Sequence, residues 1–107
     1  MMKPPIIVDD HGDLSFYSSR AAAERYLEAT DVKNEEYQAY DSSGRVLALT
    51  TVREGSIDRV KIETTSQVKP NELRNRLASF FNNLSENVDD YENLQKLVER
   101  GCRLIDE

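Results

Sequence analysis

The chain has few of the residues that most often carry chemistry or covalent stability. It contains one cysteine, one histidine and no tryptophan among 107 residues. The lone cysteine, Cys102, cannot form a disulfide within the chain, which suits a reducing cytoplasm. The first residues lack the apolar segment of a secretory signal, and no apolar run approaches the roughly 20 residues that a membrane helix needs. We therefore expect a cytoplasmic protein that does not enter a membrane.

The sequence also lacks the motifs of common catalytic and cofactor sites. It has no glycine-rich phosphate loop, no dinucleotide-binding fingerprint and no paired cysteine ligands. His11 stands between Asp9 and Asp13, a spacing that suits a metal, but the calcium-loop pattern is incomplete and a polar turn explains it. An exposed turn is also a poor place for a catalytic base, and Cys102 lies on an apolar stripe that predicts a buried, inert thiol. We predict no enzymatic activity, no metal and no cofactor.

Acidic residues outnumber basic ones by 20 to 14, which gives a net charge of -6. This balance argues against direct nucleic-acid binding, because such binding relies on a basic surface. It favours a basic protein partner, since opposite charges accelerate encounter. The alternative is that the charge only keeps a small protein soluble.

Hydrophobic patterning predicts a single α+β domain over residues 1–107 with an antiparallel sheet of about five strands. A hairpin at the N-terminus is followed by a helix and then by a three-stranded meander with glycine-containing turns. In the last strand Val60 and Ile62 alternate with charged residues, so its outer face should be wet and helices should cover only one side of the sheet. The predicted strands are residues 6–8, 14–17, 37–40, 45–53 and 57–65.

Three segments have the spacing of amphipathic helices, and the two C-terminal ones are expected to pack on one face of the sheet. The first covers residues 20–28 with Ser18 or Ser19 as N-cap, the second begins at Pro70, and the third is capped by Asn87 and weakened by Gly101. The expected packing positions are Ala22, Ala23, Tyr26 and Leu27 in the first, Leu73, Leu77, Phe80, Phe81 and Leu84 in the second, and Tyr91, Leu94, Val98, Cys102 and Ile105 in the third.

The acidic residues are concentrated in three parts of the chain. Residues 28–41 hold five acidic residues and one lysine, a net charge of -4, together with two tyrosines of the kind that anchors interfaces. For this cluster a docking surface and a set of solvated loops are both open. Helix N-terminal charge and solvation explain the second cluster, Glu86, Asp89, Asp90 and Glu92. The candidate partner contacts are Asp31, Glu35, Glu36, Tyr37, Tyr40 and Asp41, followed by Asp9, Asp10 and Asp13 of the first turn.

Several runs in the first half of the chain occur together in one kind of protein. They are IIVD at 6–9, GDL at 12–14, FYS at 16–18, AAERYLE at 22–28 and EYQAYDSSGRVL at 36–47. With these runs the chain resembles small bacterial proteins, some of them immunity proteins of contact-dependent growth inhibition and related polymorphic-toxin systems. The resemblance implies a cytoplasmic protein that binds the C-terminal domain of a cognate toxin, often a basic nuclease, and blocks its active site. The second half of the chain does not share it, so the type of toxin stays open.

Two other functions remain as alternatives. One is a small cytoplasmic adaptor or regulatory domain that has no toxin partner and associates with itself through a sheet edge. The other is a hydrolase or metal enzyme that uses His11.

Overall fold

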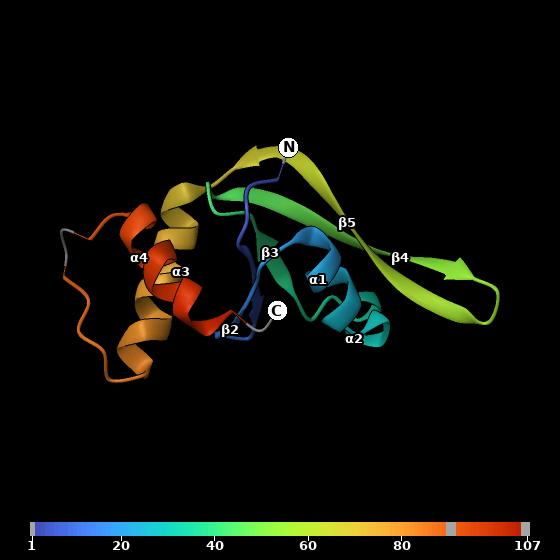
Figure 1. Cartoon of the computed structure of the whole chain (residues 1–107), viewed down its shortest axis with the longest axis horizontal. Coiled ribbons are helices and arrows are strands. Elements are labelled where there is room, and N and C mark those ends of the chain that lie inside the picture. Colours follow the sequence, from blue (N-terminus) through green and yellow to red (C-terminus); the bar gives the residue numbers. More distant parts are fainter. Residues whose placement is uncertain (1, 90–91, 106–107) are drawn as a thin grey trace.

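The computed structural model describes residues 2–89 and 92–105 and has an α+β fold, as the sequence predicts. A five-stranded antiparallel sheet has the strand order β2-β1-β3-β4-β5 (Figure 1). Among the described residues, no helix has the length and apolar character needed to cross a membrane. The strands are β1 (Ile6–Asp10), β2 (Asp13–Tyr17), β3 (Gln38–Tyr40), β4 (Arg45–Glu54) and β5 (Ile57–Val68). The helices are α1 (Arg20–Tyr26), α2 (Ala29–Lys33), α3 (Pro70–Asn83) and α4 (Leu94–Gly101), with a 3-10 turn, η1 (Cys102–Leu104), after the last.

The N-terminal hairpin joins the meander through β1 and β3. Ile7 pairs with Phe16 on β2 and with Tyr40 on β3, so β1 lies between them. At the other end of β1, Asp9 pairs with Gln38. This pairing brings the β1–β2 turn beside the segment that leads from α2 into β3, although the two are far apart in the sequence.

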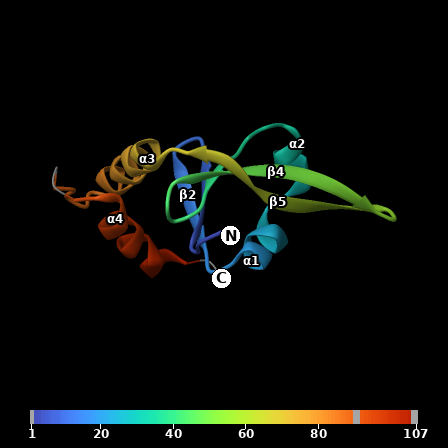
Figure 2. The same ribbon diagram turned by 90° about the horizontal axis from the view of Figure 1, so that it is seen from above.

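Helices lie on both faces of the sheet, so the prediction that they cover only one side is wrong. Helices α1 and α2 lie on one side and α3 and α4 on the other (Figures 1 and 2). The reason lies in β1, whose side chains alternate between faces: Ile6 and Val8 are buried in the core under α1 and α2, and Ile7 in the core under α3 and α4. The two C-terminal helices do share one face, as expected.

Strands β4 and β5 extend past the helices as a two-stranded arm (Figures 1 and 2). Gly55, with a φ of 63°, and Ser56 form the turn between the paired residues Glu54 and Ile57. On β5 Val60 and Ile62 are buried, whereas the charged residues that alternate with them, Arg59, Lys61 and Glu63, are exposed, as the alternation predicts.

The first helix is shorter than predicted. Ser19 caps α1, its Oγ accepting a hydrogen bond from the Ala22 amide at 3.0 Å, which confirms one of the two predicted caps. The chain leaves the helix after Tyr26, so this side chain is 52% exposed and stacks on the Tyr17 ring instead of entering the core. Residues Ala29–Lys33 form α2, a helix that the sequence patterns do not predict.

The C-terminal helices follow the predicted stripe until each helix ends. In α3 the first four stripe residues are buried, but Leu84 follows the helix and is 48% exposed. Asn93, not Asn87, caps α4, its Oδ1 accepting from the Lys96 amide at 3.0 Å. Tyr91 lies outside the described residues. Val98 is buried, whereas Ile105 is exposed because α4 ends at Gly101.

Cys102 differs from its predicted role, whereas α4 ends at Gly101, the residue expected to weaken the helix. Cys102 is exposed, so the prediction of a buried thiol is wrong, because the chain turns out of α4 at this residue. Gly101 lies inside the fold against the Phe16 ring, where an added Cβ would stand 2.2 Å from Phe16 Cε2. The glycine is required for this close approach between α4 and β2.

Candidate functional site

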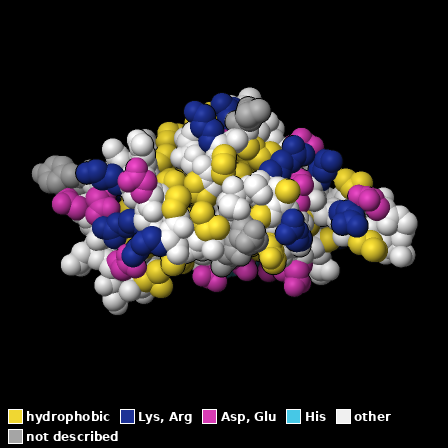
Figure 3. All heavy atoms as spheres, viewed as in Figure 1, with side chains coloured by type: hydrophobic (Ala, Val, Ile, Leu, Met, Phe, Trp, Pro, Cys, Tyr) yellow, Lys and Arg dark blue, Asp and Glu magenta, His cyan; other side chains and the backbone are white. Residues whose placement is uncertain are grey.

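The pairing of β1 with β3 gathers acidic side chains from two separate loops. Ligand atoms of Asp10, His11 and Glu36 all lie within 4.8 Å of one another, although Asp10 and Glu36 come from different clusters in the sequence. Figure 3 shows acidic side chains along the lower margin of the molecule, beneath β2 and α2. We name the solvent-accessible carboxylates of these loops the acidic loop surface, which consists of Asp10, Asp13, Asp31, Glu35 and Glu36.

Tight backbone turns support both parts of this surface. His11 and Glu35 have φ angles of 53° and 57°, left-handed values that are uncommon for residues with a side chain. In the first turn, Asp9 Oδ1 accepts a hydrogen bond from the Gly12 amide at 2.7 Å. These turns end the regular elements and leave the neighbouring carboxylates at the surface.

The pKa values of two side chains beside the acidic loop surface are raised, by a hydrogen bond for His11 and by burial and a hydrogen bond for Tyr37. His11 Nδ1 lies 2.9 Å from Asp10 Oδ1, and this hydrogen bond, with the charge of Glu36, raises the pKa of His11. The Tyr37 hydroxyl donates to Asp31 Oδ2 at 3.0 Å, and burial together with this bond raises the pKa of Tyr37 to about 12. Tyr37 is therefore neutral at pH 7, and it orients the carboxylate of Asp31.

Lys33 does not neutralise the acidic loop surface. It is the only basic residue in residues 28–41. Its Nζ lies 2.6 Å from Asp58 Oδ2, so its charge is paired with a carboxylate of β5. This pairing leaves the five surface carboxylates without a lysine or arginine from their own segments.

Three predicted partner contacts are buried, and that interpretation of Asp9, Tyr40 and Asp41 is wrong. Their exposed fractions are 5%, 0% and 1%. Asp41 accepts hydrogen bonds within the β3–β4 turn and from the Lys3 amide. Tyr40 on β3 packs in the core under α3. A buried carboxylate such as that of Asp41 needs hydrogen-bond donors from within the protein, so it is not available to a partner.

Asp9 and Tyr40 belong to a network that joins the sheet to α3. Arg76 Nη1 donates to Asp9 Oδ2, and the Tyr40 hydroxyl donates to Glu72 Oε1. The Arg76 guanidinium also lies 5.6 Å from the centre of the Tyr40 ring. Glu72 and Arg76 stand four residues apart on one helix face and are bonded to each other, a spacing that was visible in the sequence but carried no information about their partners.

The second acidic cluster is used within the C-terminal region. Arg100 pairs with both Glu86 and Glu92, and Arg103 Nη2 lies 2.9 Å from Glu86 Oε1. Asp90 lies outside the described residues. Because Glu86 and Glu92 have cationic partners, this cluster presents less negative charge than its sequence suggests, which agrees with a structural interpretation.

The described residues contain one set of side chains that could share a metal ion, Asp10, His11 and Glu36. All three are exposed, and His11 is hydrogen-bonded to Asp10 itself. Metal-binding side chains are normally oriented by further hydrogen bonds from the surrounding protein. The arrangement therefore matches a solvated acidic surface better than a metal site, and its chemical capacity is to attract positive charge.

Comparisons with protein-family models, with curated proteins and with solved structures give no match. They neither support nor contradict the resemblance to immunity proteins.

Proposed function

We propose that this protein binds a basic partner protein through the acidic loop surface. The observation that carries the proposal is the convergence of two acidic loops, from β1–β2 and from α2–β3, while Lys33 is paired elsewhere. Convergent carboxylates raise the local negative potential and accelerate association with a positively charged surface. Tyr37, half-buried beside Asp31, supplies an aromatic side chain of the kind that anchors interfaces.

The specific form of this function that we propose is an immunity protein. It would act in the cytoplasm by stoichiometric binding, with its carboxylates occupying the basic substrate groove of a toxin domain, most simply a nuclease that binds phosphates there. The acidic loop surface supports the electrostatic part of this proposal, and the resemblance in the first half of the chain supports the toxin part. The mechanism needs no catalytic residue in this chain.

The test combines charge-reversal variants with the protein encoded by the neighbouring gene, the candidate toxin. Stopped-flow association with the C-terminal domain of that neighbour is measured at several salt concentrations for the wild type and for Glu35→Lys/Glu36→Lys. We expect association of the double variant to be slower by about tenfold at low salt, with the difference shrinking as salt rises.

A matched control separates local from global charge. Glu54→Lys/Glu99→Lys makes the same change in net charge at exposed positions on the arm and on α4. If both double variants slow association equally, or if neither does, the acidic loop surface is not the binding site. A neighbour that binds but does not impair growth would exclude the immunity role while leaving the binding role.

One observation favours the second function, a small cytoplasmic adaptor without a toxin partner. The arm formed by β4 and β5 projects from the body and has an uncovered edge, a feature suited to strand-mediated association. Mass measurement by light scattering over a range of concentrations distinguishes a self-associating adaptor from a monomer that waits for its partner.

A further inference from the structure

The two edges of the sheet differ in how much other segments of the chain cover them. At β2 the C-terminal segment covers part of the edge, because Ile105 forms a parallel bridge with Phe16. At the opposite edge lies β5, the longest strand of the sheet. Helix α1 lies beside the middle of β5, and the part of β5 near the hairpin turn extends past it (Figure 1).

The pairing register shows which backbone groups of β5 point outward. Glu54 and Ile57 flank a two-residue turn and therefore exchange hydrogen bonds, so alternate residues from Asp58 onward direct their N–H and C=O groups away from β4. Ile62 confirms this alternation, since its amide donates to Glu24 Oε2 on α1 at 2.8 Å. The Ile62 amide, which points away from β4, is thus already bonded to Glu24. Between Ile62 and the turn, the residues whose backbone groups point away from β4 are Asp58 and Val60.

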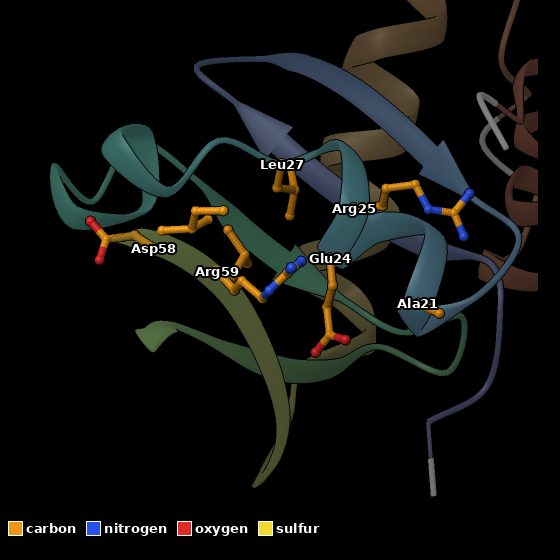
Figure 4. A pocket seen from close by; sticks show the side chains of 8 residues that line it. Ala21, Glu24, Arg25, Leu27, Asp58 and Arg59 are labelled. Carbon is orange, nitrogen blue, oxygen red and sulfur yellow. The ribbon is translucent and has the colours of Figure 1, made fainter. Parts of the chain in front are cut away.

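A groove lies against these two residues. It separates α1 from β5 and has a volume of about 370 Å³. In Figure 4, Glu24 points from α1 toward β5, whereas Arg25 projects away from the strand. Half of the lining is apolar and half is charged: Ala21, Leu27, Ile57 and Val60 on the one hand, Glu24, Arg25, Asp58 and Arg59 on the other.

We propose that residues 57–60 of β5 accept an extended segment of a partner protein as an added strand, and that this segment alternates apolar with acidic residues. Side chains of an added strand beside Asp58 and Val60 would point into the groove, where Leu27 and Val60 offer apolar contacts between charged neighbours. The intervening side chains would lie next to two exposed cations, Lys61 and Arg59, of which Arg59 is also paired with Glu54 at 3.3 Å. Charge complementarity therefore selects acidic residues at those positions.

A second copy of this chain fits the same edge less well. Antiparallel pairing of two β5 strands over residues 57–61 places Arg59 opposite Arg59 of the other copy, with Lys61 of each copy diagonally beside that pair. A longer pairing requires the Glu24 carboxylate to leave the Ile62 amide. The segment is therefore assigned to a different protein, and this surface is separate from the acidic loop surface and does not depend on its function.

The experiment uses a short fluorescent peptide of alternating valine and glutamate, with a valine–lysine peptide as the charge control. Fluorescence anisotropy measures binding of each to the full chain. We expect the glutamate peptide to bind at least about tenfold more tightly than the lysine peptide. No binding of the glutamate peptide, or equal binding of both, overturns the proposal. So does a dimer that light scattering detects for the wild type but not for Asp58→Pro.

Variants test the backbone contribution. Asp58→Pro removes an outward amide without removing a hydrogen bond to β4, whereas Asp58→Ala removes the same side chain and its contact with Lys33 but keeps the amide. We expect the proline variant to lose about tenfold in affinity relative to the alanine variant. Equal affinities of these two folded variants overturn the proposal. Glu24→Ala, which frees the Ile62 amide, should strengthen binding of the glutamate peptide, and weaker or unchanged binding contradicts strand addition.

Discussion

The carboxylate of Asp41 lies 3.1 Å from the amide nitrogen of Arg45, inside the turn that joins β3 to β4. Its Oδ1 also accepts from the amide and the hydroxyl of Ser43, and its Oδ2 accepts from the Lys3 amide. One buried side chain therefore satisfies four donors and ties the segment before β1 to the turn. Asp41 lies in the run at 36–47 and is among the predicted partner contacts, but its role here is structural.

Replacing Asp41 should destabilise the fold more than replacing an exposed aspartate. Asp41→Ala leaves these donors without their acceptor, and we expect it to lower the free energy of unfolding by about 2–4 kcal/mol. Asp41→Asn keeps one acceptor oxygen and should lose less. Urea denaturation followed by circular dichroism measures the difference, with the exposed Asp13→Ala as the control. Equal losses for Asp41→Ala and Asp13→Ala would contradict this account.

Two leucines of the same predicted stripe should respond differently to truncation. Leu77 on α3 is 0% exposed, whereas Leu84 is 48% exposed. Leu77→Ala creates a cavity in the core under α3 and α4, so we expect a loss of about 2–5 kcal/mol in the free energy of unfolding. Leu84→Ala should cost less than about 1 kcal/mol. Chemical denaturation of both variants provides the measurement, and similar costs would show that Leu84 packs in solution.

The bond between Tyr40 and Glu72 should make stability depend on pH in the acid range. The hydrogen bond from Tyr40 lowers the pKa of Glu72 from its ordinary 4.5. A folded-state pKa below the unfolded value gives a stabilisation that is complete above pH 4.5 and is lost as the pH falls through the folded-state value. Thermal melts from neutral to acid pH should show a smaller acid-induced loss for Tyr40→Phe than for the wild type. Parallel curves would assign the acid sensitivity to other carboxylates.

His11 should make binding of a basic partner depend on pH near neutrality. Asp10 and Glu36 raise the pKa of His11 above its ordinary 6.5, and Asp9 adds to the effect. Below that pKa the imidazolium cancels part of the negative charge of the acidic loop surface. As the pH rises through it, association with a basic partner should become faster, and His11→Gln should remove this step. Stopped-flow rates across this range measure it, and a step that persists in the variant belongs to the partner.

Local patterns in the sequence were sufficient for much of the fold. The strand segments, the Ser19 cap and the buried positions Leu73 and Leu77 follow from periodicity and capping, which depend on residues close in the chain. The acidic character of residues 28–41 is likewise a property of composition.

The arrangement of these parts depended on contacts that no local pattern contains. The run Ile6 to Val8 is apolar on both faces, so only packing shows that helices cover both sides of the sheet. Pairing of β1 with β3 unites Asp10 with Glu36, and internal hydrogen bonds remove Asp9, Tyr40 and Asp41 from the surface. Sequence thus determined which residues form the strands, the longer helices and the acidic loops, because these preferences act over a few residues. Tertiary structure alone decided which carboxylates face solvent, because burial is set by segments distant in the chain.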